Sequence, residues 1–160
     1  MKTLVVYSSQ SGNTKKLAEA VYEVLPGEKE IHPVEEAPDP EGFDLVAVGF
    51  WFKAGNPDPK SAEYLRKVQG TRLFLFATHG AAPDSEHARK GMAAARALAE
   101  GADIVGTFNC QGAVKPGLLE KVKARPNPPE WIGDADSAAG HPDEGDFEAL
   151  KNAVKRAAGF

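Results

Sequence analysis

Residues 7–14 read Tyr-Ser-Ser-Gln-Ser-Gly-Asn-Thr. They follow an apolar run at residues 4–7 and precede a stretch with helical spacing that begins at Lys15. This order of strand, hydroxyl-rich loop and helix presents backbone N–H groups at a helix N-terminus, where a partial positive charge favours an anion. Five of the six positions 9–14 carry hydroxyl or amide side chains, whereas an ordinary N-cap needs only one. We therefore predict a phosphate-binding loop that consists of Ser9, Gln10, Ser11, Gly12, Asn13 and Thr14.

Size and charge limit the classes of function that the chain can have. Its 160 residues predict a single domain over residues 1–160. The net charge of −4 argues against nucleic acid as a partner, because a phosphate backbone requires a basic face. The single cysteine excludes an intrachain disulfide and suits a reducing cytoplasm. Because we find neither a signal-peptide pattern nor an apolar run of roughly 18 residues, we expect a cytoplasmic protein without membrane attachment.

Apolar runs alternate with segments that have helical spacing. Near-continuous apolar runs are typical of strands buried on both faces of a parallel sheet, and they cover residues 3–7, 45–50, 73–78 and 103–110. A shorter, more polar run covers residues 28–34, and helical spacing marks residues 14–25, 60–68, 84–99 and 143–158. This alternation predicts a three-layer α/β/α sandwich. Residues 111–145 break the pattern, and there we predict an elaborated surface loop with a short helix at 117–123.

Other phosphate-binding folds lack support in this sequence. The G-x-x-x-x-G-K-[ST] motif of P-loop nucleotidases is missing, and no G-x-G-x-x-G motif follows the first strand. A receiver domain requires acidic residues where this chain has Ser8 and Ser9. A low-molecular-weight phosphatase requires a cysteine in the loop, and this loop contains none.

Residues 9–14 resemble the FMN-phosphate fingerprint of flavodoxins, T/S-x-T/S-G-N-T, and they lie between the corresponding strand and helix. The order of elements resembles the flavodoxin-like fold over almost the whole chain, which implies a five-stranded parallel sheet of order 2-1-3-4-5. Later segments, at residues 48–51, 77–80, 109–112 and 141–143, resemble a divergent branch of the family. That branch includes small flavodoxins proposed to feed electrons to partner reductases. The resemblance implies FMN as the cofactor.

In such a fold, the loops at the carboxyl ends of neighbouring strands hold the flavin ring. The loop after the third strand contributes Trp51, Phe52, Lys53, Ala54, Gly55 and Asn56. Either Trp51 or Phe52 is expected to stack on the ring, while the other packs in the core. The resemblance implies a peptide rotation that Gly55 would ease, and a cation at Lys53 would favour the anionic reduced flavin.

The loop after the fourth strand contributes Thr78, His79, Gly80 and Ala81. Its backbone groups are expected to bond the pyrimidine edge of the ring, and His79 is a candidate to stack, donate or supply a proton. Flavodoxins usually carry a second stacking aromatic in this region, but the chain has none between Phe76 and Phe108. Trp131 in the long loop is a candidate for that cover.

Covalent catalysis and metal chemistry find little support. Cys110 ends the fifth strand without an identifiable base nearby in the sequence, so we expect a buried hydrophobic side chain and no catalytic residue. The histidines lack the spacing of metal ligands, and we predict no metal.

The leading hypothesis is an FMN-binding electron-transfer protein that serves a reductase donor and an acceptor enzyme as redox partners. We expect its acidic residues to steer a basic partner; they are Glu35, Glu36, Asp39, Glu41, Asp58 and those at 134–146. Two alternatives remain open at this point. One is an FMN-dependent NAD(P)H reductase of the same fold, and the other is a flavodoxin-like module that has lost FMN and binds a phosphorylated ligand or a protein.

Overall fold

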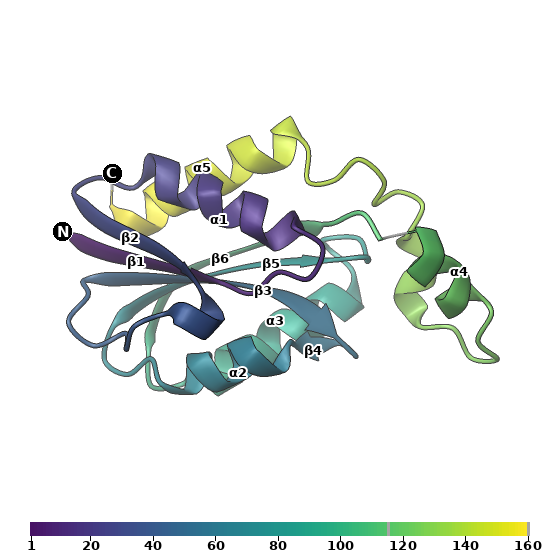
Figure 1. Cartoon of the computed structure of the whole chain (residues 1–160), viewed down its shortest axis with the longest axis horizontal. Helices are drawn as coiled ribbons and strands as arrows, with labels where there is room; N and C mark the ends of the chain where they lie inside the picture. Colours follow the sequence, from purple (N-terminus) through teal and green to yellow (C-terminus); the bar gives the residue numbers. More distant parts are fainter. Residues whose placement is uncertain (115, 160) are drawn as a thin grey trace.

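The computed structural model describes residues 1–114 and 116–159 and confirms the predicted α/β sandwich. Five strands form a parallel sheet in the order β2-β1-β3-β5-β6 (Figure 1). They are β1 (Lys2–Tyr7), β2 (Glu28–Pro33), β3 (Leu45–Lys53), β5 (Arg72–His79) and β6 (Asp103–Gln111). Counted without the two-residue strand β4 (Asn56–Pro57), which pairs antiparallel with β3, this is the predicted order 2-1-3-4-5.

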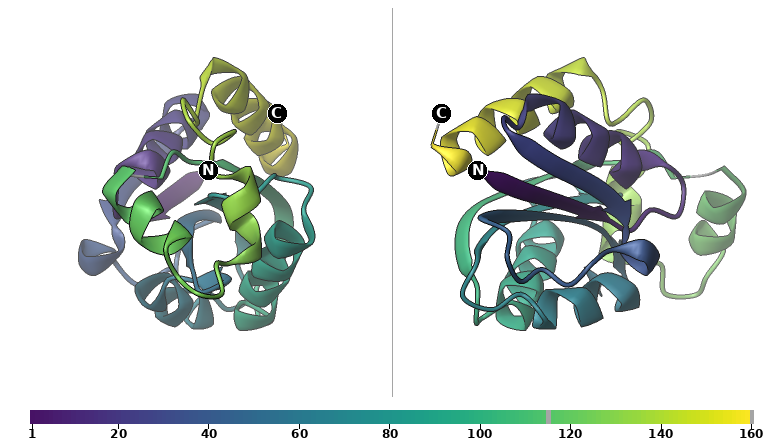
Figure 2. Two further views of the ribbon diagram at one scale, coloured as in Figure 1. Left: turned by 90° about the vertical axis from the view of Figure 1, so that its right-hand side faces the viewer. Right: turned by 60° about the vertical axis from the view of Figure 1, so that its left-hand side comes forward.

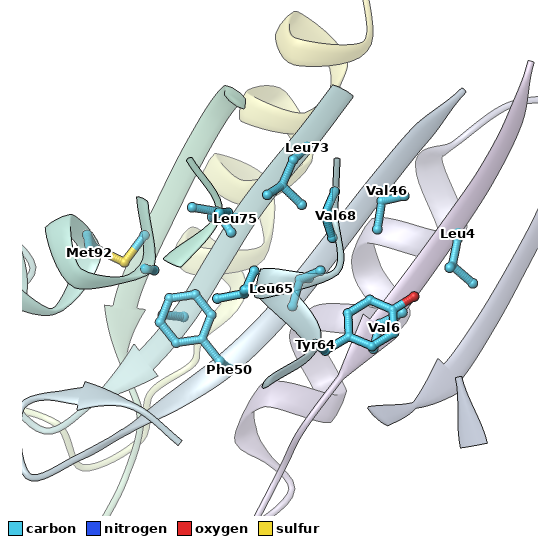
Figure 3. Packing of buried hydrophobic residues seen from close by; sticks show 14 residues of the cluster. Leu4, Val6, Val46, Phe50, Tyr64, Leu65, Val68, Leu73, Leu75 and Met92 are labelled. Carbon is cyan, nitrogen blue, oxygen red and sulfur yellow. The ribbon is translucent and has the colours of Figure 1, made fainter. Parts of the chain in front are cut away.

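Two pairs of helices cover the faces of the sheet. One face carries α1 (Asn13–Val24) and α5 (Glu144–Ala158), and the other carries α2 (Pro59–Arg66) and α3 (Glu86–Leu98) (Figure 1). Because successive side chains of a strand point to opposite faces, Leu4 and Val6 pack on the α2–α3 side, and Val5 packs on the α1–α5 side. Figure 3 shows the α2–α3 side, where Phe50, Leu65 and other apolar side chains are closely packed.

The third strand is longer than the sequence predicted. Trp51, Phe52 and Lys53 continue β3 instead of forming a loop, and Ala54 and Gly55 make the two-residue turn back to β4. Both turn residues have positive φ, 51° at Ala54 and 79° at Gly55, as a hairpin turn that matches the strand twist requires. A local hairpin therefore fixes this side of the site.

The fourth parallel strand is also longer, and the helix after it begins later. His79 is the last residue of β5, although the sequence had placed it in a loop. Helix α3 begins at Glu86 because the Ser85 side chain accepts a hydrogen bond from the Ala88 N–H, 3.2 Å away, and acts as the N-cap.

The elaborated segment between β6 and α5 contains two short helices. The predicted helix is present as α4 (Pro116–Lys123), and the 3-10 helix η2 (Glu130–Asp134) follows it. The end view shows this green segment lying across the carboxyl ends of the strands (Figure 2). A second 3-10 helix, η1 (Val34–Glu36), follows β2.

In the part of the chain that the structure describes, no helix combines the length and the apolar character that crossing a bilayer requires.

Close packing at Gly49 generates a first prediction. A Cβ at this position in β3 would overlap the ring of Phe76, which is fully buried. We expect Gly49→Ala to lower the free energy of unfolding by about 1–3 kcal/mol through overpacking, measured by urea denaturation. Gly117→Ala is the control, because among the described residues no atom beyond its chain neighbours and its own helix backbone lies within 4 Å of an added Cβ. Equal stability of the two variants would contradict the packing described here.

Candidate functional site

A pocket of about 890 Å³ opens at the carboxyl edge of the sheet. The loops after β1, β3, β5 and β6 contribute to its walls, as parallel strands that end at one edge allow. Twelve of the sixteen residues predicted to bind the cofactor line it: Gln10, Ser11, Asn13, Thr14, Trp51, Phe52, Lys53, Ala54, Gly55, Thr78, His79 and Gly80. The tertiary structure thus brings three separate sequence segments to one cavity.

The other four predicted residues support the walls without lining the cavity. The Ser9 hydroxyl accepts a hydrogen bond from the Gly12 N–H at 3.0 Å, and Gly12 turns the chain into α1 with a φ of 94°. The Asn56 side chain donates to the Ala54 carbonyl at 3.3 Å and closes the hairpin turn. Ala81 is fully buried, and its N–H donates to His79. In this structure these residues shape the site from outside the cavity.

The hydroxyl-rich loop is joined to the neighbouring strand ends. The hydroxyls of Thr14 and Thr78 lie 2.9 Å apart and are buried, which links the start of α1 to the end of β5. The Asn13 amide donates to the Ala113 carbonyl at 3.1 Å. A Cβ at Gly112 would lie 2.7 Å from that amide nitrogen, so a larger residue there would have to displace the Asn13 side chain. These contacts join the loop to the end of β5 and to the chain after β6.

The two candidate stacking residues have different surroundings. The Phe52 ring lies between His79 and His87, with ring centroids 4.7 and 5.7 Å away, and it stacks on Phe50. A Cβ at Gly91 of α3 would overlap it. Phe52 is thus largely committed to packing, as the sequence analysis expected for one of the pair. Trp51 points to the opposite face of the strand and lines the cavity.

A buried carboxylate anchors the hairpin that carries Trp51. Asp58 is 2% exposed, and its carboxylate accepts hydrogen bonds from the N–H groups of Trp51 at 3.3 Å and Ser61 at 3.2 Å. The Asp58 N–H donates in turn to the Trp51 carbonyl at 2.9 Å. Asp58 is therefore the N-cap of α2, and its expected role as a surface acid that steers a partner is wrong.

His79 is a buried, neutral imidazole. Its Nδ1 accepts a hydrogen bond from the Ala81 N–H at 3.1 Å, so the proton lies on Nε2, which donates to the Asn109 side-chain oxygen at 2.8 Å. Burial lowers the pKa of His79 below the ordinary 6.5, despite the opposing effect of the hydrogen bond to Asn109. With both nitrogens engaged, His79 holds the pocket floor and is poorly placed to shuttle protons.

Trp131 forms part of the pocket wall, where the sequence had suggested a cover. A Cβ at Gly80 would lie 2.8 Å from its indole Cε3 atom, so the indole lies directly against the chain after β5. Gly80 leaves the space that this contact needs. The chain has two tryptophans, and both of them line the pocket.

Nine further lining residues are not among the predicted cofactor-binding residues, and all of them lie on α3, between β6 and η2, or in η2 itself. They are His87, Gly112, Ala113, Val114, Leu118, Val122, Arg125, Pro129 and Trp131, of which Trp131 had been expected as a cover. The amphipathic spacing of Leu118 and Val122 was the available signal, because residues four apart share one face of a helix. It could not indicate which surface that face covers.

The charged side chains that line the pocket in the described part of the chain are cations. Lys53 and Arg125 are exposed cations in the lining, and the described lining residues include no carboxylate. Glu35, one of the acids expected to steer a partner, instead pairs with Lys60 at 2.8 Å on another part of the surface. The pocket favours anions although the chain as a whole is acidic.

Cys110 and the histidine cluster lie outside the lining. Cys110 is 1% exposed, and burial raises the pKa of its thiol well above the usual range, which disfavours the nucleophilic thiolate. His141, Asp143 and Asp146 offer ligand atoms within 4.8 Å of one another, a grouping that the sequence spacing had not revealed. Hydrogen bonds within the group account for the closeness of these side chains, because Asp143 and Asp146 form the capping box of α5.

The contrast between two histidines can be tested by NMR titration. At pH 6.5 we expect His79 to be neutral with its proton on Nε2, and His141 to be protonated, because Asp146 raises the pKa of His141. Neutral His79 contributes fully to the stability of the fold above pH 6.5, and this contribution is lost as the pH falls through its lowered pKa. Protonated His141 contributes fully below pH 6.5, and this contribution is lost as the pH rises through its raised pKa. A higher pKa at His79 than at His141 would contradict the assignment.

Comparisons of sequence with known proteins identify the family of this chain. The flavodoxin domain model matches residues 4–155. The flavodoxin-like domain-containing protein BilS of Clostridioides difficile (strain CD3) is 34% identical over 128 residues, which cover 77% of this chain and 73% of that protein.

Two solved structures share the fold. Oxidised flavodoxin 2 from Bacillus cereus is 17% identical and superposes with a TM-score of 0.67 over 99% of both chains. A flavoprotein from Lactobacillus acidophilus NCFM, solved in complex with FMN, is 18% identical with a TM-score of 0.56 over 68% of this chain and 92% of its own. The match over residues 4–155 and the identity to BilS show that the chain belongs to the flavodoxin domain family.

Proposed function

We propose that this chain binds FMN in the pocket at the carboxyl edge of the sheet and passes electrons to a partner redox protein. Family membership and the FMN bound by a protein of the same fold support the cofactor. The observation that carries the proposal is the hydroxyl-rich loop at the N-terminus of α1, which opens into the pocket.

The start of α1 suits a phosphate. Among the described residues no side chain caps this helix, and its first turn contains no acidic residue. By contrast α2, α3 and α5 each have a carboxylate or hydroxyl as N-cap. The N–H groups at the start of α1 and the Ser11 hydroxyl are therefore available to an anion, and each charge-assisted hydrogen bond contributes about 1.5–3 kcal/mol.

The remainder of the pocket suits a flat aromatic ring. Its volume of about 890 Å³ lies within the ~300–1,000 Å³ typical of cofactor sites. Trp51 and Trp131 provide aromatic surface, and the backbone at Gly80 is available to polar ring atoms. When bound, FMN supplies reversible uptake and release of electrons, while the protein binds, orients and partly shields it.

The exposure of the pocket supports an electron carrier, because a partner protein could approach a bound flavin. Lys53, Ala54, Leu118 and Arg125 line the pocket and are also exposed, so a ligand there would lie close to the molecular surface. Cys110 is buried outside the lining, and both nitrogens of His79 are engaged. Because the exposed charges of the described lining are cations, we propose an acidic docking face on the partner, instead of the basic one inferred from net charge.

The alternative is an FMN-dependent NAD(P)H reductase of the same fold. The cavity volume of about 890 Å³ favours it, because a second substrate needs room beside the flavin. Steady-state assays distinguish the two functions.

The phosphate assignment can be tested with two ligands. We expect Ser11→Ala to weaken FMN binding about tenfold or more, because it removes one donor to the phosphate. Affinity for riboflavin, which lacks the phosphate, should be unchanged in isothermal titration. Thr14→Ala should weaken both ligands, because it also breaks the bond to Thr78. Equal losses for FMN and riboflavin in Ser11→Ala would contradict a phosphate contact.

The carrier assignment predicts a yellow protein that is inert towards nicotinamide cofactors. FMN-loaded protein should oxidise NADH or NADPH only when a flavodoxin reductase is added, measured anaerobically by absorbance at the flavin and nicotinamide bands. Rapid turnover by the protein alone would favour the reductase. A protein that stays colourless after FMN is added would contradict both functions.

A further inference from the structure

A network of hydrogen bonds joins η2 to the chain after β5 and to the end of β6. The Asp134 carboxylate accepts a hydrogen bond from the Ala82 N–H at 3.1 Å, just after the Gly80 contact with Trp131. Gln111 is 7% exposed, and its side-chain amide donates to the Asp134 carbonyl at 3.3 Å and to the Ser137 hydroxyl at 2.9 Å. Segments from three parts of the chain therefore meet at Asp134.

Asp134 and Trp131 are coupled by the geometry of their helix. Both belong to η2, and residues three apart in a 3-10 helix lie one above the other on the same side. That side faces the chain after β5, where Trp131 contacts Gly80 and Asp134 binds Ala82. The hydrogen bond of Asp134 and the contact of the indole therefore lie one turn apart on the same side of η2.

We propose that Asp134 is a positioning residue that holds Trp131 in the pocket wall against the flavin ring, an inference that rests on the proposed FMN site. Trp51 needs no such device, because it belongs to β3 and is fixed by the sheet. Trp131 belongs to a surface segment outside the sheet, and the contacts of Asp134 and Gln111 hold it there. The loop after β5 lacks an aromatic residue, and Trp131 of η2 supplies the aromatic surface in its place.

The variants Asp134→Ala and Asp134→Asn separate the hydrogen bond from the charge. We expect Asp134→Ala to weaken both FMN and riboflavin by the same factor, about three- to tenfold, because the effect acts on the ring. Asp134→Asn should bind nearly as the unmodified protein does, since its amide oxygen can still accept from Ala82. Asp136→Ala is the matched control: this neighbouring carboxylate is 84% exposed and pairs only with Lys123 among the described residues.

A double-mutant cycle tests whether the effect passes through Trp131. Trp131→Ala alone should weaken both flavins about tenfold. In that background Asp134→Ala should have little further effect, because the ring contact that it positions is already gone. Additive losses would overturn the proposal, as would unchanged riboflavin affinity in Asp134→Ala.

Tryptophan fluorescence gives a readout that is independent of flavin. In Trp51→Phe, Trp131 is the single tryptophan, and its quenching by iodide in the flavin-free protein should increase when Asp134→Ala is added and stay unchanged with Asp134→Asn. Equal quenching in all three proteins would overturn the proposal while leaving the FMN site intact. Failure of the unmodified protein to bind either flavin would instead overturn the proposed function, and the flavin contact of Trp131 with it.

Discussion

The parallel hydrogen-bonded alignment of β1, β3, β5 and β6 brings four strand ends to one edge of the sheet. Beyond that edge the strand ladder stops, and buried backbone groups need other partners. They find them in one another: the Gly112 N–H donates to the His79 carbonyl at 2.8 Å, and the Ala113 carbonyl accepts from Asn13. The pocket is therefore bordered by loops that are hydrogen-bonded to one another.

The core determines the register of the strands that form this edge. Central strands are buried on both faces, so a shift of one residue in register would exchange Leu4 and Val6 with Val5 between two differently shaped cores. Glycines at close approaches set the fine spacing: Gly49 accommodates Phe76, and Gly91 accommodates Phe52. A site mounted on such a scaffold can hold a planar cofactor in one orientation with few charged groups.

The loop at residues 9–14 could be predicted from the sequence, whereas the parts of the site that depend on contacts between distant residues could not. The loop at residues 9–14 was identified because strand, loop and helix are adjacent in the chain, so the signal is local. His79 was placed in a loop because its position in β5 depends on pairing with Gln111 of β6, which is distant in the chain. Asp58 was read as a surface acid for the same reason, since its partners become apparent only when the hairpin forms.

Local patterns determined which elements form, their order and the anion-binding character of the first loop, because apolar periodicity and N-terminal helix chemistry act over a few residues. Tertiary structure decided which aromatics face the cavity, where the cations gather and what the segment after β6 covers. Trp131 lies 51 residues beyond Gly80 in the chain, and their contact depends on the packing of η2 against the end of β5. Contacts of that kind leave no periodic trace in a single sequence, because they are fixed by the meeting of surfaces and not by spacing along the chain.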